Sequence, residues 1–284
     1  MDVTVRRLLP AEIEQAVRVE EAAMKGHGYL RDVSHLFFYD EEGPMLGAFH
    51  GEELVGVAKY TVLPDRTAWL ETLRVSPEHQ RKGVGRQMYE VFVRLSHQLG
   101  VESMAMYTGL ANIPSASLAR LFGLETAGKY REFQLDLAGK KPETEAVGFE
   151  AVGEEEGCAL LESLCEKYEH FIVFNRTFMH MDYPILCALA REGKVLLDRS
   201  DGSFMAFGNR FLERRSVQIA AMAGNYQKCM DYALRIGLER GVPQVVAMAP
   251  LDDEALQSAL EAYGFHAAAD LQVMSGPVRS NRSE

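Results

Sequence analysis

The sequence predicts an α/β protein that contains a mixed sheet and is built from two related halves. In each half, segments whose apolar residues repeat every two positions alternate with segments whose apolar residues repeat every three or four positions. These are the periods of strands and helices. With 284 residues, 47% of them hydrophobic and 25% charged, the chain is long enough for two domains with separate cores.

The first half is predicted to contain, in order, a strand, two helices, three strands, a helix, a strand, a helix and a strand. Pro10 favours a helix start, and Gly51 lies in a short hairpin turn. Gly100 and Gly123 follow helical stripes, where glycine commonly ends a helix. The second helix, before Tyr39, is poorly defined and could equally be a loop. The predicted strands are 2–9, 45–50, 54–63, 69–75, 101–107 and 130–137, and the defined helices are 10–24, 86–99 and 115–122.

The second half is predicted to repeat this plan in a reduced form. Residues 138–148 are polar and lack periodicity, so we expect a linker between a first domain, 1–137, and a second, 149–275. The tail 276–284 is expected to be disordered. The second domain is predicted to contain helices at 154–168, 183–192, 226–240 and 253–263, and strands at 194–198, 203–211, 215–222, 244–249 and 268–274.

The most informative stretch runs from Trp69 to Arg94 and is predicted to be a strand, a loop and an amphipathic helix. The two-residue period places residues 69, 71, 73 and 75 on one strand face. Two glycines and three cations precede the helix, whose free backbone N–H groups attract anions. A phosphate-bearing ligand fits this pattern, and a glycine turn with solvated charges fits it as well. The loop is Gln80-Arg81-Lys82-Gly83-Val84-Gly85-Arg86.

This loop, together with Val75-Ser76-Pro77, resembles the cofactor motif of the GNAT superfamily of acetyl-CoA-dependent N-acetyltransferases. That signature is Arg or Gln, two residues, Gly, one residue, and Gly or Ala. The order of elements in the first half is also similar to the GNAT fold, and Leu260-Glu-Ala-Tyr-Gly264-Phe265 resembles a helix end of the same family. The resemblance implies the GNAT acyl-CoA N-acyltransferase fold in two tandem copies. The second copy has only Ala223-Gly224-Asn225-Tyr226-Gln227-Lys228 in place of the loop, so we expect it to be degenerate and to bind no CoA.

The resemblance also implies how the co-substrate acetyl-CoA is bound. In the family, backbone amides of the loop hold the pyrophosphate, and the preceding strand splays from its neighbour and pairs with the pantetheine. An amide of Leu73 or Val75 would be the oxyanion donor. The residues expected to bind acetyl-CoA are Leu73, Arg74, Val75, Gln80, Arg81, Lys82, Gly83, Val84, Gly85, Arg86, Asn112, Ser115 and Ser117.

Glu71 is the expected catalytic base or amine anchor. It lies four residues before Val75, where many family members carry an acidic residue. The alternatives are an exposed strand glutamate or a partner for Arg74. His27, between two glycines after the first helix, could also face the acceptor site, although a lone loop histidine is usually solvent-exposed.

The sequence departs from the family at the group that protonates the leaving thiolate. Family spacing from Asn112 and Gly123 places the usual tyrosine at position 119, which is Ala119 here. Tyr107 is the expected substitute, and Tyr130 is a second candidate. Both tyrosines could instead simply pack within their strands.

Composition limits the partners and the compartment. The net charge of −11 disfavours binding to nucleic acid and mildly favours cationic partners. No signal-peptide core or membrane-length apolar run is present, so we expect a cytoplasmic protein with no membrane contact. Cys158 and Cys165 are seven residues apart, which predicts packed thiols on one helix face, and no cysteine or histidine spacing indicates a metal site.

The leading functional hypothesis is an N-acetyltransferase that acts on the amine of a small molecule, an amino acid or a peptide. The amine would attack acetyl-CoA directly in a ternary complex, since the motif region has no cysteine nucleophile. The alternative is an acyl-CoA-binding regulatory or interaction protein with little or no turnover, which Ala119 and the degenerate second copy support. The acceptor and the acyl chain length stay open. The second domain could be a scaffold, one wall of the acceptor pocket or the surface of a homodimer.

Overall fold

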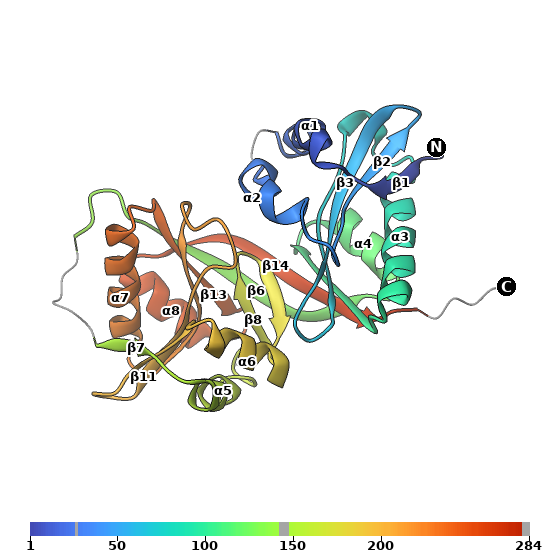
Figure 1. The fold of residues 1–284 in the computed structure, drawn as a ribbon. Coiled ribbons are helices and arrows are strands. Elements are labelled where there is room, and N and C mark those ends of the chain that lie inside the picture. Colours follow the sequence, from blue (N-terminus) through green and yellow to red (C-terminus); the bar gives the residue numbers. More distant parts are fainter. Residues whose placement is uncertain (26–27, 142–147, 280–284) are drawn as a thin grey trace. The chain divides into compact units, whose positions relative to one another are not determined.

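The computed structural model describes residues 1–25, 28–141 and 148–279, and the chain forms two compact units (Figure 1). Unit 1 comprises Met1–Met106, Asn112–Thr126 and Met274–Glu284, and unit 2 comprises Tyr107–Ala111 and Ala127–Val273. This division differs from the continuous segments 1–137 and 149–275 expected from the sequence. Residues 127–137 belong to unit 2, and residues 274–275 belong to unit 1.

Unit 1 is built on a sheet whose first four strands are antiparallel neighbours in chain order, while the fifth runs parallel to the fourth. Residues 107–109 of the fifth strand belong to unit 2. Each strand lies within two residues of its predicted bounds, because strand alternation and the intervening turns agree. The strands are β1 (Thr4–Arg7), β2 (Met45–His50), β3 (Glu53–Val62), β4 (Ala68–Val75) and β5 (Ser103–Gly109).

The helices of unit 1 cover both faces of β1–β4. Helices α1 (Ile13–Met24) and α2 (Leu30–Phe37) lie on one side and α3 (Val84–Leu99) on the other (Figure 1). A short 3-10 turn, η1 (Pro10–Glu12), precedes α1, and a second, η2 (Pro77–His79), follows β4. Side chains of α3 and of α4 (Ile113–Leu121) share one buried core with the sheet. This core fixes the start of α3 relative to the end of β4.

The main strands of unit 2 follow the order β14-β6-β13-β12-β11-β10-β7, in which β12 and β13 are parallel. Strands β6 and β14 are longer than predicted, and their residues 125–126 and 274–277 belong to unit 1. The strands are β6 (Glu125–Asp136), β7 (Phe149–Ala151), β10 (Val195–Asp198), β11 (Ser203–Gly208), β12 (Val217–Ala223), β13 (Gln244–Pro250) and β14 (His266–Pro277).

The helices of unit 2 follow the prediction with one correction. Helices α6 (Tyr183–Arg191), α7 (Tyr226–Glu239) and α8 (Glu254–Tyr263) occur as expected, but α5 spans only Glu154–Glu162. The residues that follow α5 form turns and then an unpredicted hairpin, β8 (Phe171–Phe174) and β9 (Thr177–His180). Its two turn residues, Asn175 and Arg176, have φ values of 50° and 59°, as a two-residue hairpin loop requires.

The bounds of β14 and α5 also correct the predicted tail and the predicted packing of two cysteines. The predicted tail starts inside a strand, since Gly276 and Pro277 end β14, and residues 280–284 lie outside the described part of the chain. Residues 142–147 of the predicted linker also lie outside it. Cys158 and Cys165 do not share a helix face, because α5 ends at Glu162. Instead, the Sγ atoms of Cys158 and Cys187 lie 3.3 Å apart as free thiols.

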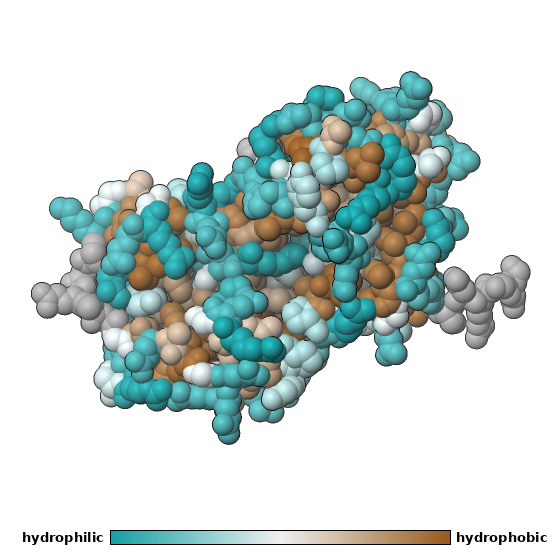
Figure 2. Space-filling view, viewed as in Figure 1, coloured by the Kyte–Doolittle hydropathy of each residue, from teal (hydrophilic) through white to brown (hydrophobic). Residues whose placement is uncertain are grey.

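The visible face of the molecule is largely hydrophilic, with smaller hydrophobic areas between the polar side chains (Figure 2). Leu9, Tyr39, Ile113 and Tyr183 are among the large apolar side chains that are mainly exposed. No helix in the described part of the chain is long and apolar enough to cross a membrane.

Candidate active site

Helix α3 begins without a side-chain cap. Gly83 is its N-cap residue, with a φ of 86°, and makes no side-chain capping hydrogen bond. The first N–H groups of a helix have no partner inside the helix, so they are suited to an anion. A Cβ on Gly83 would meet no atom within 4 Å, whereas a Cβ on Gly85 would lie 3.1 Å from Cδ2 of Leu118. Gly83 therefore keeps the helix start open, and Gly85 allows α4 to approach it.

Exposed cations flank this helix start. Arg81 has a φ of 59°, and neither Arg81 nor Lys82 forms an ion pair with a described residue. Nε of Arg86 lies 3.3 Å from Oε1 of Glu90, but both side chains are exposed, so this pair is weak. Val84 is buried and can offer a ligand only its main chain.

Two of the predicted binding residues instead contact the end of β4. Nε2 of Gln80 donates to the carbonyl oxygen of Val75 at 3.0 Å, which ties the loop to the strand. Nη1 of Arg74 donates to the carbonyl oxygen of Leu73 at 3.0 Å. The Gln80 side chain therefore holds the loop to the strand end, and the Arg74 side chain folds back onto its own strand.

Gln87, for which the sequence gives no functional signal, anchors residues 1–3 beside the loop. Its Oε1 accepts from the N–H of Val3 at 3.1 Å, and its Nε2 donates to the carbonyl oxygen of Met1 at 2.8 Å. The N-terminal ammonium of Met1 donates to the carbonyl oxygen of Lys82 at 3.1 Å. These contacts hold residues 1–3 beside the loop.

Strands β4 and β5 pair over only two residues. Ala68 lies opposite Met104 and Trp69 opposite Ala105, and β4 then continues to Val75. Within the described residues, β4 has no strand partner on this edge beyond Trp69. The splay expected from the family resemblance is therefore present, and it leaves main-chain groups of β4 available to an extended ligand.

A β-bulge interrupts β4 at Thr72. Glu71 pairs with Lys59 and Arg74 with Val57, so one extra residue lies on β4 between them. Thr72 has a φ of 57°, a conformation that costs a β-branched residue about 1–3 kcal/mol. The bulge shifts the alternation by one residue.

The prediction that residues 69, 71, 73 and 75 share one strand face is wrong for this reason. Leu73 and Val75 pack against the core that contains Leu70, whereas Trp69 lies outside that core. The strand period holds on each side of the bulge, but not across it.

Glu71 is buried, with 6% of its surface exposed, and Oγ1 of Thr61 donates to its Oε1 at 2.7 Å. The alternative of an exposed strand glutamate is therefore wrong. Nζ of Lys59, which lies opposite Glu71 in the ladder, donates to Oδ2 of Asp40 at 2.6 Å. The carboxylate of Glu71 thus has a fixed orientation inside unit 1.

The start of α4 carries three other predicted binding residues. Oδ1 of Asn112 accepts from the N–H of Ser115 at 3.3 Å and so caps the helix, and Ser117 is exposed. Ala119 is completely buried in the core shared by α3 and α4. Position 119 thus presents a methyl group to the core.

The two candidate tyrosines belong to unit 2. Tyr130 is completely buried, and its hydroxyl donates to the carbonyl oxygen of Tyr168 at 2.7 Å. Burial raises the pKa of Tyr130, so the structure does not favour it as a proton donor. The ring of Tyr107 packs at 6.2 Å from that of Phe178. His27 lies outside the described residues.

The helix of unit 2 that corresponds to α3 begins differently. Oδ1 of Asn225 accepts from the N–H of Lys228 at 3.2 Å and caps α7. Nζ of Lys228 forms ion pairs with Asp198 and with Asp201. The helix start and its cation are therefore satisfied by the protein itself.

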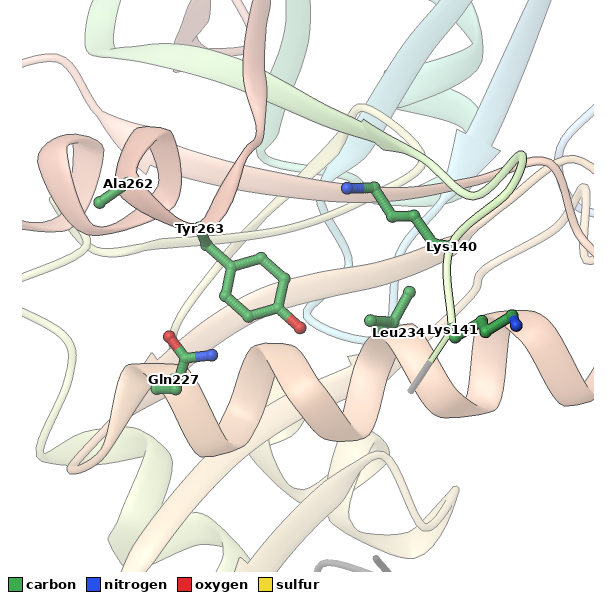
Figure 3. Close-up of a pocket in the computed structure, with 6 residues that line it drawn as sticks. All are labelled: Lys140, Lys141, Gln227, Leu234, Ala262 and Tyr263. Atoms are coloured by element: carbon green, nitrogen blue, oxygen red, sulfur yellow. The ribbon is translucent and has the colours of Figure 1, made fainter. Parts of the chain in front are cut away.

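A pocket of about 350 Å³ in unit 2 lies along α7 and is open to solvent (Figure 3). Tyr263 reaches from the end of α8 towards α7, where its hydroxyl donates to Oδ1 of Asp231 at 2.8 Å. None of the predicted site residues lines this pocket. Its lining residues are Lys140, Lys141, Gln227, Leu234, Ala262 and Tyr263.

Residues 11–124 match the model of the Acetyltransferase (GNAT) family. Over these residues the chain is similar to that family. Over 91 residues it is 28% identical to YsnE, an uncharacterized N-acetyltransferase of Bacillus subtilis (strain 168), and the match covers 31% of this chain and 60% of that protein. The loop, the splayed strands and the bulge described above all lie within the matched residues.

Two solved structures show that the resemblance in fold extends over both halves. A tandem GNAT protein from the clavulanic acid biosynthesis pathway superposes with a TM-score of 0.62 at 14% identity, covering 99% of this chain and all of that one. A GCN5-related N-acetyltransferase from Sphaerobacter thermophilus gives 0.63 at 13% identity, covering 98% and 96%. The predicted fold, a tandem arrangement of GNAT folds, is confirmed.

The GNAT domain fits an acyl-CoA by its own geometry. The uncapped start of α3 suits a diphosphate, and the absence of a side chain at Gly83 leaves room for it. The open edge of β4 suits the amide groups of a pantetheine chain.

Proposed function

We propose that the GNAT domain is an acetyl-CoA-dependent N-acetyltransferase whose acceptor is the amine of a small molecule, an amino acid or a peptide. The uncapped start of α3 beside the open edge of β4 is the observation that carries this proposal. Together they offer main-chain donors to a diphosphate and to the extended chain attached to it. The family match over residues 11–124 supports the same activity.

In this proposal, acetyl-CoA supplies the acetyl group as a thioester. The N–H groups of residues 84–86 bind the diphosphate, and Arg81 and Lys82 neutralise its charge. The main chain of residues 73–75 binds the pantetheine arm. Asn112, Ser115 and Ser117 offer further polar groups at the start of α4.

Glu71 accepts the proton of the attacking amine, directly or through a water. An alkyl ammonium has a pKa near 10 and must lose a proton before it can attack. Glu71 is buried and held by Thr61, so its carboxylate is oriented before the acceptor arrives. A positioned base accelerates such a step by about 10²–10⁴-fold. An N–H of Leu73 or Val75 donates to the carbonyl oxygen on which negative charge develops.

The leaving thiolate is protonated without the usual tyrosine, since position 119 is an alanine buried in the core. Ser115 and Ser117 supply hydroxyl groups on α4, either directly or through water. The role of Tyr107 as the acid stays a prediction.

The second candidate function is an acyl-CoA-binding protein with little or no turnover. Ala119 is the observation that favours it, because a buried methyl group cannot protonate a thiolate. In that case the loop and the β4 edge would still bind the co-substrate.

A calorimetric titration with acetyl-CoA, paired with thiol release in the presence of an amine panel, tests both functions. We expect saturable binding of acetyl-CoA and thiol release with at least one amine. S-acetyl-pantetheine, which lacks the diphosphate, should bind at least tenfold more weakly. Binding of acetyl-CoA without thiol release from any amine would favour the second function. The absence of binding would refute both.

A further inference from the structure

Thr72 has a backbone conformation that is unusual for a β-branched residue in a strand. It is the only β-branched residue with a positive φ among the described residues, and the only non-glycine residue with a positive φ inside a strand. Glycine is the usual residue at such a bulge position, because a Cβ is strained there. Thr72 is 4% exposed, so the conformation is held by protein neighbours. Backbone strain of this kind persists only where surrounding contacts enforce it.

The bulge itself does not require a positive φ. Strand β12 of unit 2 carries a bulge as well, since Ala206 pairs with Ala221 and Phe207 pairs with Ile219. The extra residue there, Ala220, is not among the residues with a positive φ. The left-handed conformation at Thr72 is therefore a separate feature of β4.

Tyr29, the residue before α2, is the neighbour that holds Thr72 in the left-handed conformation. The hydroxyl of Tyr29 lies 2.6 Å from Oγ1 of Thr72. The ring of Tyr29 packs edge-on against Phe37, which is 2% exposed, with 6.4 Å between the centroids. A side chain held by its ring can fix the position of its hydroxyl.

The main chain of Tyr29 is held as firmly as its ring. Oε2 of the buried Glu20 accepts from the N–H of Tyr29 at 3.0 Å and from the N–H of Leu30 at 2.7 Å. A carboxylate on α1 thus caps the start of α2, where the helix dipole favours a negative charge. A Cβ on Gly28 would lie 2.4 Å from the same oxygen, so glycine is needed at position 28 for this contact.

The hydrogen bond between Tyr29 and Thr72, here called the tether, lies where β4 has the least support from other strands. On one side, β4 has no strand partner beyond Trp69 among the described residues, and on the other side its ladder with β3 is interrupted at the bulge. The ladder with β3 resumes at Arg74, so Thr72 and Leu73 are the residues of β4 that the sheet supports least, and contacts from outside the sheet matter most there. The hydrogen bond between Tyr29 and Thr72 is such a contact.

We propose that Tyr29 is a positioning residue, whose hydrogen bond holds Thr72 in the left-handed conformation and thereby aims the main chain of residues 73–75 at the reacting thioester. This inference rests on the proposed acetyl transfer. It assigns Tyr29 no contact with the substrate. Its effect passes through Thr72.

A double-mutant cycle with Tyr29→Phe and Thr72→Val tests the proposal. Each variant should lower kcat by about tenfold, the double variant should be no slower than either single variant, and the KM for acetyl-CoA should stay within twofold. Thr72→Ser keeps the hydroxyl and should retain most of kcat. Tyr39→Phe, an exposed tyrosine just after α2, is the matched control and should leave kcat unchanged. Independent losses that multiply in the double variant, or an equal loss in Tyr39→Phe, would overturn the proposal.

A readout that needs no turnover separates this inference from the proposed function. Backbone hydrogen exchange across residues 72–76 should become faster in both Tyr29→Phe and Thr72→Val, and no faster in the double variant. If the wild-type protein binds acetyl-CoA but acetylates no amine, the proposed function fails and the exchange experiment still decides whether the tether exists. Unchanged exchange in Tyr29→Phe would show that Tyr29 does not hold the bulge.

Discussion

The starts of α3 and α7 occupy equivalent places in two similar folds but are built in opposite ways. At α3 a glycine takes the N-cap position, no side chain caps the helix, and Arg81 and Lys82 have no ion pair among the described residues. At α7 the side chain of Asn225 caps the helix, and Lys228 is paired with two aspartates. The difference shows that the same fold can carry a helix start whose N–H groups are open to an anion, or one whose N–H groups are capped by the protein's own side chain. The side chains of a few loop residues decide which one forms.

The same contrast extends to the strand that precedes each helix. Both β4 and β12 are bulged, and each has a parallel neighbour on one edge. In β4 a buried carboxylate, Glu71, directly precedes a bulge residue with a positive φ. In β12 the residue before the bulge is Ile219, which is apolar and buried. If the proposed function is correct, substitutions in unit 1 should change chemistry and ligand affinity, while matched substitutions in unit 2 should change only stability.

The largest expected effect follows from Glu71→Gln. The variant keeps the shape and the contact with Thr61 but cannot accept a proton, so kcat should fall by roughly 100-fold or more. Its dissociation constant for acetyl-CoA, measured by calorimetry, should stay within twofold. Glu53→Gln, an exposed carboxylate on β3, is the control and should match the wild type. Equal kcat values for Glu71→Gln and the wild type would remove Glu71 from the mechanism.

A smaller effect, on affinity, should distinguish the two ends of α3. Gly83 and Gly100 both have positive φ, and at both a Cβ would meet no atom within 4 Å. Gly83→Ala and Gly100→Ala should therefore lower stability by similar amounts, about 1 kcal/mol each. Only Gly83→Ala should weaken acetyl-CoA binding, by about tenfold, because its methyl group occupies the space beside the uncapped N–H groups. Similar affinities in the two variants would place the diphosphate elsewhere.

The lysines at the two helix starts should differ in what they affect. Lys82→Ala should raise the dissociation constant of acetyl-CoA about threefold and weaken its salt dependence, with little change in stability. Lys228→Ala should leave binding unchanged but lower the free energy of unfolding, because the buried Asp198 loses its ion-pair partner. Calorimetry and urea denaturation of both variants measure the contrast. A loss of affinity in Lys228→Ala would indicate that unit 2 binds the co-substrate as well.

The smallest effect concerns pH and unit 2 alone. Lys228 and Ser200 lower the pKa of Asp198 to about 2, below the usual aspartate value near 4. Because the folded pKa is the lower one, the stabilisation is complete above about pH 4 and is lost as the pH falls towards 2. Asp198→Asn should show a flatter decline of the urea midpoint between pH 4 and pH 2, and an unchanged slope would contradict this assignment.

Much of the fold could be predicted from the sequence because local signals agreed with the final packing. Gly100 and Gly123 do have positive φ next to the ends of α3 and α4, and the loop before α3 has the open backbone that its glycines indicate. The strand faces of β4 could not be predicted beyond residue 71. A left-handed bulge residue is usually signalled by glycine, and Thr72 is instead a typical strand former.

Other features of the structure could not be predicted because no local sequence signal marks them. The β8–β9 hairpin turns at Asn175 and Arg176, and arginine gives no local signal for a positive φ. Tyr29, Thr61 and Gln87 act through partners that are distant in sequence, so their roles appear only with the tertiary contacts. The division of β6 and β14 between two units could not be predicted either, because hydrophobic periodicity identifies a strand but not the core that receives it.

Unit 1 needs the end of β14, which is translated after the whole of unit 2, to complete its core. Met274 is buried in the core of that unit, and the N–H of Val278 donates to the carbonyl oxygen of Glu102 at 2.7 Å. A ribosome releases these residues only after the whole second half has been translated. A nascent chain, or one that stops before residue 274, would therefore present the loop of residues 80–86 on a unit that still lacks part of its core.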